Sequence, residues 1–267
     1  IFIKYYEQDM IDISEAGCSS TLYLGGDDVV FSYTAAATTV INIRFFNILG
    51  TWSGLYVFDA CPDAEEVSCL GSVTNSGTED RMVTLEVTEG QQIFIIGSTW
   101  PSPQSFTFDI EITEVACASP QNLVVSPIDL ESASVSFTSY SNNTSFEVVY
   151  GAPGFDPEIE GETVAGTESP IIVEGLNSGE TYDFYVRALC DGDLQTDLVG
   201  PTSFLVPQLG SACATPLVIE SVPFLTENVD ASGYGNFHSA AQLAESNCIS
   251  EFGSFYISGD EVVYSLT

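Results

Sequence analysis

The stretch Gly-Asp-Asp-Val-Val-Phe-Ser-Tyr-Thr at residues 26–34 decides the architecture that we expect, because residues 259–267 read Gly-Asp-Glu-Val-Val-Tyr-Ser-Leu-Thr. The two stretches align without gaps at an offset of 233 residues (259 minus 26), and the match extends back to Tyr23 and Tyr256. Self-similarity at a long fixed spacing indicates an array of related units. We therefore expect one period of a longer repeat protein, which starts part-way through one unit and stops at nearly the same phase of the next.

Short segments in which apolar and polar residues alternate follow the first copy. They lie at residues 38–46, 54–60, 82–87, 91–98 and 105–115. A period of two is typical of half-buried β-strands, and the turns between these segments are rich in Gly, Ser, Asn and Thr. Only residues 239–247 suggest a helical period. We expect an all-β protein of tandem β-sandwiches, in which residues 1–115 form an antiparallel, jelly-roll-like sandwich.

The charge of the chain is strongly one-sided. Its 38 acidic residues face four basic ones, Lys4, Arg44, Arg81 and Arg187, which gives a formal net charge of -34. Nucleic acid and an anionic membrane surface are excluded as partners, because no basic patch exists to replace phosphate counterions. Hydrophobic residues make up 45% of the chain, so it can fold around cores. No apolar run reaches the ~20 residues that cross a bilayer, and residue 1 begins no recognisable signal peptide.

The seven cysteines form neither the CxxC pairs nor the Cys/His clusters that zinc needs, so we interpret them as disulfides of an oxidising compartment. We expect Cys61 to pair with Cys69 across a short acidic loop. The other expected pairs are Cys117–Cys190 and Cys213–Cys248. Cys18 is then left over, and because it corresponds to Cys248 in the repeat, we expect its partner to lie before residue 1.

Residues 117–206 carry a second set of short strands with turns at intervals typical of an immunoglobulin-like sandwich. The segments CASPQNLVVSPIDLESASVSFT, FEVVYGAPGFDP, VEGLNSGETYDFYVRALC and VGPTSF resemble a fibronectin type III domain of the kind found in secreted proteins of Bacteroidota. The resemblance implies that Leu176 and Tyr182 form the tyrosine corner of that family. Phe137 stands where the family usually has a core tryptophan.

The flanking segments, residues 1–115 and 213–267, resemble the bacterial pre-peptidase C-terminal-like domain. This resemblance depends on CATPLVI at 213–219, on the cysteine before each copy of the repeated strand, on GLYVFDAC at 54–61 and on IFIIGS at 93–98. It implies a jelly-roll-like sandwich in each flank, the first of them N-terminally truncated and the second cut short at residue 267.

Clustered acids in loops suggest calcium, which takes six to eight oxygen ligands. The candidates are Asp59, Asp63, Glu65 and Glu66 around the Cys61–Cys69 loop, Asp191, Asp193 and Asp197 in CDGDLQTD, and Asp27 and Asp28 with their repeat equivalents Asp260 and Glu261. None matches an EF-hand loop, so solvated acidic turns are the alternative at each site. No cofactor is required for the function that we expect.

We find no catalytic motif in the sequence. His238 is the only histidine, and no GxSxG or HExxH surrounds it. With so many acids, carboxylate pairs arise by chance and do not single out a glycosidase site. Trp52, Trp100 and Tyr140 could form a carbohydrate-stacking platform, or could belong to the core or to hinge packing.

We therefore expect a non-catalytic structural or adhesive repeat of a large secreted bacterial cell-surface protein. Mixed arrays of these two domain types are similar to giant surface adhesins of gliding Bacteroidota that use type IX secretion, an analogy of domain content. The expected partners are neighbouring repeats, surface polysaccharide, or outer-membrane secretion and motility proteins. Two alternatives stay open: an accessory region of a secreted peptidase or polysaccharide-degrading enzyme, and an export substrate captured on the type IX machinery.

Overall fold

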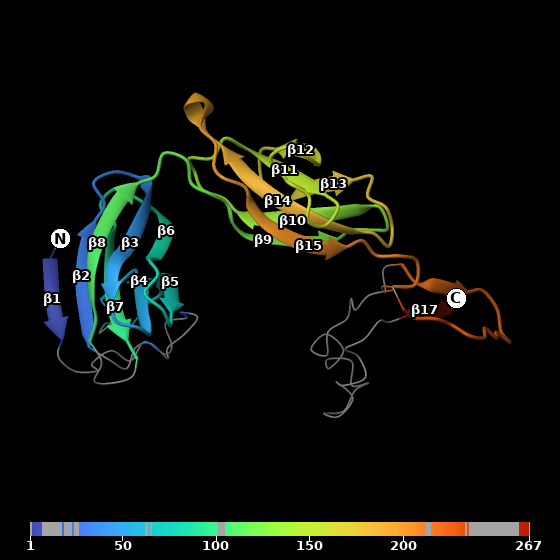
Figure 1. The fold of residues 1–267 in the computed structure, drawn as a ribbon, viewed down its shortest axis with the longest axis horizontal. Coiled ribbons are helices and arrows are strands. Elements are labelled where there is room, and N and C mark those ends of the chain that lie inside the picture. The colour runs from blue at the N-terminus through green and yellow to red at the C-terminus, as the bar shows by residue number, and fades with distance from the viewer. Residues whose placement is uncertain are drawn as a thin grey trace. The chain divides into compact units, whose positions relative to one another are not determined.

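The computed structural model of the chain describes residues 2–6, 18, 23, 27–61, 64, 66–100, 105–211, 215–232, 234 and 262–266 (Figure 1). They divide into two compact units, one of residues 1–118 with 140–142, the other of residues 119–139 with 143–267. Within the described ranges the regular structure is β-strand apart from one 3₁₀ turn at Asp191–Asp193. The prediction of an all-β protein of tandem β-sandwiches is confirmed.

The described part of the first unit contains eight strands. They are β1 (Phe2–Tyr6), β2 (Asp28–Thr34), β3 (Thr39–Leu49), β4 (Ser53–Phe58), β5 (Cys69–Asn75), β6 (Arg81–Val87), β7 (Gln92–Thr99) and β8 (Thr107–Glu114). Five of them form a sheet in the order β1-β2-β7-β4-β5, and three form a second sheet in the order β6-β3-β8. Every pairing is antiparallel. Apart from the β1–β2 and β4–β5 connections, each step along the chain crosses to the other sheet, so the sheets form a sandwich.

The core of the first unit lies between these two sheets. It is built by alternate residues of the strands, such as Ile41, Ile43 and Phe45 of β3, which are each at most 1% exposed. The rings of Phe45 and Phe108 stack at 4.0 Å between centroids. Gly97 of β7 makes room for them, because a Cβ there would lie 3.0 Å from each ring.

The outer face of the five-stranded sheet is buried as well. A second cluster, with Val30, Tyr56, Phe58 and Ile96 at its centre, packs against partly buried Cys18 and other residues. This explains why β4 is buried at every position rather than at alternate ones. A strand that is covered on both faces reads as a continuous apolar run.

The second unit contains a sandwich of seven strands. They are β9 (Gln121–Pro127), β10 (Ser132–Thr138), β11 (Ser145–Gly151), β12 (Glu162–Gly166), β13 (Ile171–Glu174), β14 (Thr181–Leu189) and β15 (Val199–Leu205). The sheets have the orders β13-β10-β9 and β12-β11-β14-β15, and all pairings are antiparallel. This strand order is that of a fibronectin type III-like sandwich, as the sequence predicts for residues 117–206.

Two details of this sandwich agree with the sequence. The backbone N–H of Asn177 donates to the hydroxyl of Tyr182 at 3.1 Å, and Leu176 is buried, so the predicted tyrosine corner is confirmed. Phe137 is 7% exposed and packs its ring against Phe146 at 4.7 Å, so it fills the core position that the family usually gives to tryptophan.

The last described strands, β16 (Leu217–Ile219) and β17 (Tyr264–Leu266), pair in parallel. Apolar side chains nearby are exposed, among them Val222 at 71% and Leu225 at 81%. The predicted separate domain from residue 213 onward stays a prediction, as does the division of the chain at 115–117 and 206–213. The helical period at 239–247 lies outside the described residues.

Candidate functional site

The acidic residues that the sequence offers as calcium ligands lie in different surroundings. Asp27 is exposed, whereas Asp28 is 4% exposed. Asp191, Asp193 and Asp197 are exposed around the 3₁₀ turn. In the described ranges no three Asp, Glu, His or Cys side chains come close enough to hold a metal ion. Asp63, Glu65, Asp260 and Glu261 lie outside those ranges, so calcium binding stays a prediction.

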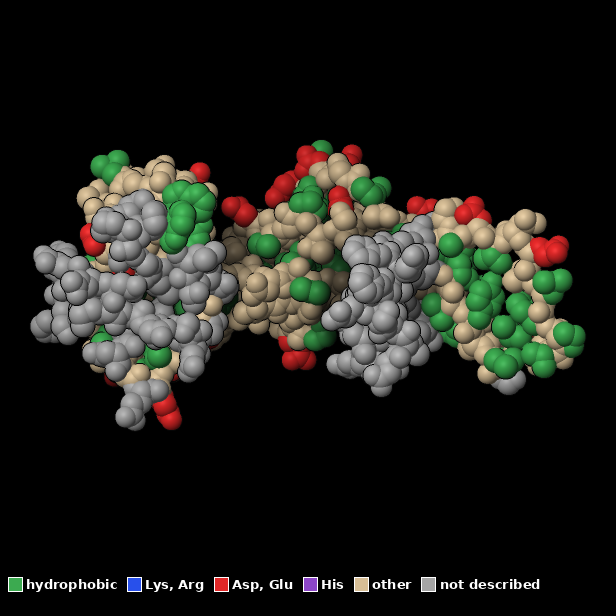
Figure 2. Space-filling view, turned by 90° about the horizontal axis from the view of Figure 1, so that it is seen from below, with side chains coloured by type: hydrophobic (Ala, Val, Ile, Leu, Met, Phe, Trp, Pro, Cys, Tyr) green, Lys and Arg blue, Asp and Glu red, His purple; other side chains and the backbone are tan. Residues whose placement is uncertain are grey.

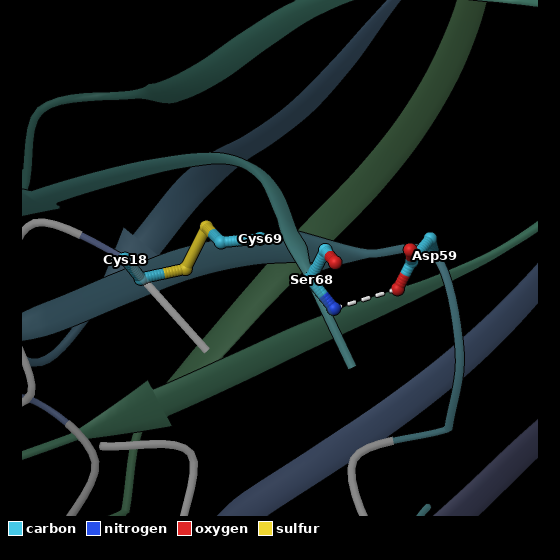
Figure 3. Close-up of a disulfide and its surroundings, with 4 residues drawn as sticks. All are labelled: Cys18, Asp59, Ser68 and Cys69. Atoms are coloured by element: carbon cyan, nitrogen blue, oxygen red, sulfur yellow. Dashed lines mark hydrogen bonds between the residues drawn. A yellow bond between two sulfur atoms is a disulfide. The ribbon is translucent and has the colours of Figure 1, made fainter. Parts of the chain in front are cut away.

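Asp59 and Glu66, the other two candidates, flank the segment before β5. The backbone N–H of Ser68 donates to Asp59 Oδ1 at 2.7 Å, and the N–H of Asp59 donates to the Ser68 carbonyl at 3.2 Å (Figure 3). Glu66 is exposed. Asp59 therefore closes the loop between β4 and β5 by accepting a backbone hydrogen bond.

Beside this loop lies the Cys18–Cys69 disulfide, with a Cα–Cα distance of 5.4 Å (Figure 3). The predicted Cys61–Cys69 pair is therefore wrong, and so is the prediction that the partner of Cys18 lies before residue 1. The physical reason is the covering of the outer face of the five-stranded sheet. Cys18 and Cys69 both pack against the buried cluster there, which brings together two cysteines that are 51 residues apart.

The remaining predicted disulfides are tested only in part. Cys117 and Cys190 are each disulfide-bonded, as the sequence predicts for both. Cys213 and Cys248 lie outside the described residues, so their pairing stays a prediction. The only histidine, His238, also lies there.

Aromatic side chains gather at the end of the first unit where β4 begins and β7 ends. The rings of Trp52 and Trp100 lie 5.3 Å apart at an interplanar angle of 58°. Tyr23 stacks on Trp52 at 6.0 Å and 25°. Trp52 is 42% exposed and Trp100 is 44% exposed. The structure thus brings together the two tryptophans that the sequence singled out and adds Tyr23. Tyr140, the third predicted aromatic residue, is half-buried, and burial raises its pKa.

The backbone at Trp52 adopts an unusual conformation. Its φ of 58° lies in the left-handed region, which bulky side chains rarely enter and which costs about 1–3 kcal/mol. Two hydrogen bonds hold it there: the Trp100 N–H donates to the Trp52 carbonyl at 2.9 Å, and the Trp52 N–H donates to the Ser76 carbonyl at 3.4 Å. The first bond also joins the two tryptophans directly through their backbones.

A buried arginine supports the same end of the sandwich. Arg81 is 0% exposed, and its guanidinium donates to the carbonyls of Ser53 (3.2 Å), Asn75 (3.0 Å) and Gly77 (2.8 Å) and to that of Glu79. Burial lowers the pKa of this guanidinium, although nearby acidic groups oppose the shift. Four carbonyls on one cation fix the 75–79 turn against Ser53, the residue next to Trp52.

Two of the remaining basic residues are paired with acids. Arg44 forms ion pairs with Asp80 and with Glu111, the latter at 2.8 Å. Arg187 pairs with Glu147 at 2.7 Å. Figure 2 shows acidic side chains scattered over one face, with no lysine or arginine visible among the coloured atoms. The chain as a whole carries a formal net charge of -34, so its surface is negative on balance.

Tyr56, in the buried cluster on the outer face of the five-stranded sheet, also has a perturbed pKa. Tyr56 is 0% exposed, and burial raises its pKa above the ordinary value, with further contributions from Tyr23 and the Asp28 carboxylate. The phenol of Tyr56 therefore stays neutral at ordinary pH, and its ring contributes to packing.

No helix in the described part of the chain is long and apolar enough to cross a bilayer.

A scan against protein-family models and a search of curated proteins each found no match. Among solved structures, the fn3 domain of the human collagen alpha-1(XX) chain is 20% identical with a TM-score of 0.29, over 34% of this chain and 85% of that one. The fn3 domain of human contactin 1 is 19% identical with a TM-score of 0.28, over 33% of this chain and 76% of that one. The FN1–FN3 domains of chicken CNTN1 are 14% identical with a TM-score of 0.30, over 60% of this chain and 58% of that one. Since these scores are low, the fold of residues 119–206 is assigned from its own strand order and tyrosine corner.

Proposed function

We propose that this chain is a non-catalytic structural and adhesive repeat segment of a large secreted bacterial cell-surface protein, of the attachment or gliding type. In this role, sandwiches joined in series hold binding surfaces away from the cell and present many weak contacts that add by avidity.

The observation that carries the proposal is the repeated stretch at 26–34 and 259–267. In the first copy it forms β2, a central strand of a sandwich with its own core. In the second copy Tyr264–Leu266, which correspond to residues 31–33, form β17. A fibronectin type III-like sandwich with a separate core stands between them. Strands of related sequence at a long fixed spacing are typical of an array.

Two further properties support secretion and an extended array. Disulfides persist in oxidising compartments, and four cysteines of this chain are disulfide-bonded: Cys18 with Cys69, and also Cys117 and Cys190. A net charge of -34 makes neighbouring units repel each other, which favours solubility and an extended chain. Type IX export and gliding rest on the resemblance to Bacteroidota domains alone.

A second candidate function is that of an accessory region attached to a secreted peptidase or polysaccharide-degrading enzyme. Both predicted domain types also occur as non-catalytic appendages, so the same sandwiches would serve there. A third is an export substrate held by the secretion machinery. A catalytic domain elsewhere in the same polypeptide would favour the second candidate, and co-purification with outer-membrane secretion proteins would favour the third.

The adhesive role is tested with monovalent antibody fragments raised against the purified chain. Applied to intact cells of the source organism, they are expected to label the surface and to reduce attachment or gliding, whereas fragments against an unrelated surface protein leave both unchanged. Labelling that requires permeabilised cells, or surface labelling without any effect on attachment or movement, would overturn the proposal.

A further inference from the structure

We propose that Tyr23, Trp52 and Trp100 form a stacking surface for a neutral polysaccharide. This inference rests on the proposed adhesive function and gives it a ligand class and a site. The surface lies at the end of the first unit where β4 begins and β7 ends.

The backbone and the exposure of Trp52 indicate that the cluster is a binding site rather than part of the core. Trp52 keeps a left-handed backbone that a glycine would adopt without strain, and the residue is nevertheless 42% exposed. Exposure and strain both oppose folding stability, so packing does not account for a tryptophan here. The cluster is also held rigidly, because Trp100 donates to the Trp52 carbonyl and Arg81 fixes the adjacent turn.

The spacing of the rings favours a flat ligand. Centroid distances of 5.3 Å and 6.0 Å are those of rings in direct contact, so no gap remains between them for a caged ammonium group. A ligand must instead lie across the exposed faces and edges. The apolar C–H face of a pyranose ring suits this surface, since its partly positive hydrogens meet the negative face of an aromatic ring.

Charge selects among polysaccharides. Of the four basic residues, Arg44 and Arg187 are paired with acids and Arg81 is buried among carbonyls. Among the basic side chains that the structure describes, none is therefore left to pair with a uronic acid polymer or a sulfated glycan, and a protein of net charge -34 repels such an anionic chain. A neutral polysaccharide carries no charge for this protein to repel.

The chain carries its own reporter for this site. Its only two tryptophans are Trp52 and Trp100, so intrinsic tryptophan fluorescence observes the cluster alone. We would titrate the purified protein with four neutral polysaccharides: mixed-linkage β-glucan, xyloglucan, galactomannan and glycogen. Alginate serves as the acidic probe and poly-L-lysine as the cationic one. At least one neutral polysaccharide is expected to shift the emission to shorter wavelength in a saturable way, while alginate does not.

Variants locate the binding on the cluster. Trp52→Ala and Trp100→Ala should each weaken binding about tenfold or more, as loss of a stacked ring does, with the other tryptophan as reporter. Trp100→Phe keeps a ring and should recover most of the affinity. Phe224→Ala removes an aromatic side chain of similar exposure (49%) in the second unit and should leave binding unchanged. Circular dichroism and melting temperature check that each variant folds.

The inference is overturned if none of the four neutral polysaccharides changes the emission, if poly-L-lysine or alginate produces the same saturable shift to shorter wavelength, or if binding persists in both alanine variants. The polysaccharide site and the proposed repeat-array function can fail independently of each other. Binding by a chain that proves to be an enzyme appendage keeps the site and removes the array, whereas surface labelling without sugar binding does the reverse.

Discussion

Removal of the Cys18–Cys69 disulfide should destabilise the first unit strongly. The bond closes a loop of 51 residues, for which the chain-entropy model gives about 14 cal/mol/K, or about 4 kcal/mol at 25 °C. The rejected Cys61–Cys69 pair would close a loop of only eight residues (69 minus 61), worth about 2.5 kcal/mol on the same model. The two pairings therefore predict different variants to be unstable and by different amounts.

Urea unfolding followed by tryptophan fluorescence measures this, since both tryptophans lie in the first unit. The double variant Cys18→Ser/Cys69→Ser leaves no new thiol at the site and should lose about 4 kcal/mol of unfolding free energy. The matched control Cys61→Ser should change it by less than about 1 kcal/mol. A loss below about 1 kcal/mol in the double variant, or a larger loss in the control, would refute the reasoning.

Four other changes test separate parts of the structure. Replacing Arg81 with Met leaves several carbonyls without their donor and should destabilise the first unit by about 3 kcal/mol or more, measured by the same urea unfolding. Tyr182→Phe removes the hydroxyl that accepts from Asn177 and should cost the second unit about 1 kcal/mol, measured by thermal unfolding of far-ultraviolet circular dichroism. Burial and a hydrogen bond to Glu162 raise the pKa of Tyr150 to about 12. The stability that its neutral phenol provides is therefore complete below pH 10 and is lost as the pH rises toward 12. In Tyr150→Phe the unfolding free energy should no longer fall for this reason between pH 10 and pH 12. Calcium at millimolar concentration should release or absorb heat and raise the melting temperature if the acidic loop at Asp59 binds it, as the sequence predicts.

Each of these has a clear contrary result. Retention of stability in Arg81→Met would mean that water or neighbouring groups satisfy the turn. A Tyr182→Phe variant as stable as the unchanged protein would show that the ring alone makes the corner. A stability profile that is identical with and without the Tyr150 hydroxyl above pH 10 would remove that assignment. Titration with calcium that gives neither heat nor stabilisation would remove the metal site.

The strands that could be predicted from the sequence are those with a buried face. The segments around β3, β6 and β8 alternate clearly, because one side of each contacts the core and the other faces outward. β5 and β12 were not predicted. Both lie at the edge of a sheet, with few fully buried positions, so their sequences carry little hydrophobic pattern.

Pairing of cysteines depended on information that the sequence does not hold. Cys61 is nearest to Cys69 along the chain, but Cys18 is brought to it by the covering of the outer sheet face. The same correction weakens the reason for pairing Cys248 with Cys213, since Cys248 corresponds to Cys18. The sequence identifies Trp52 and Trp100 as candidate exposed aromatic residues. Tyr23 stands out in the sequence only as part of the repeat, and its stacking on Trp52 in the structure is what adds it to the aromatic cluster.

The size of the intact protein tests the central claim most directly. An antibody against this chain, applied to a blot of whole cells and culture medium of the source organism, should detect a polypeptide several times larger than 28.6 kDa, the mass of the 267 residues. Mass spectrometry of that polypeptide should find further copies of the 233-residue period. A single product of about 30 kDa would contradict the repeat array altogether.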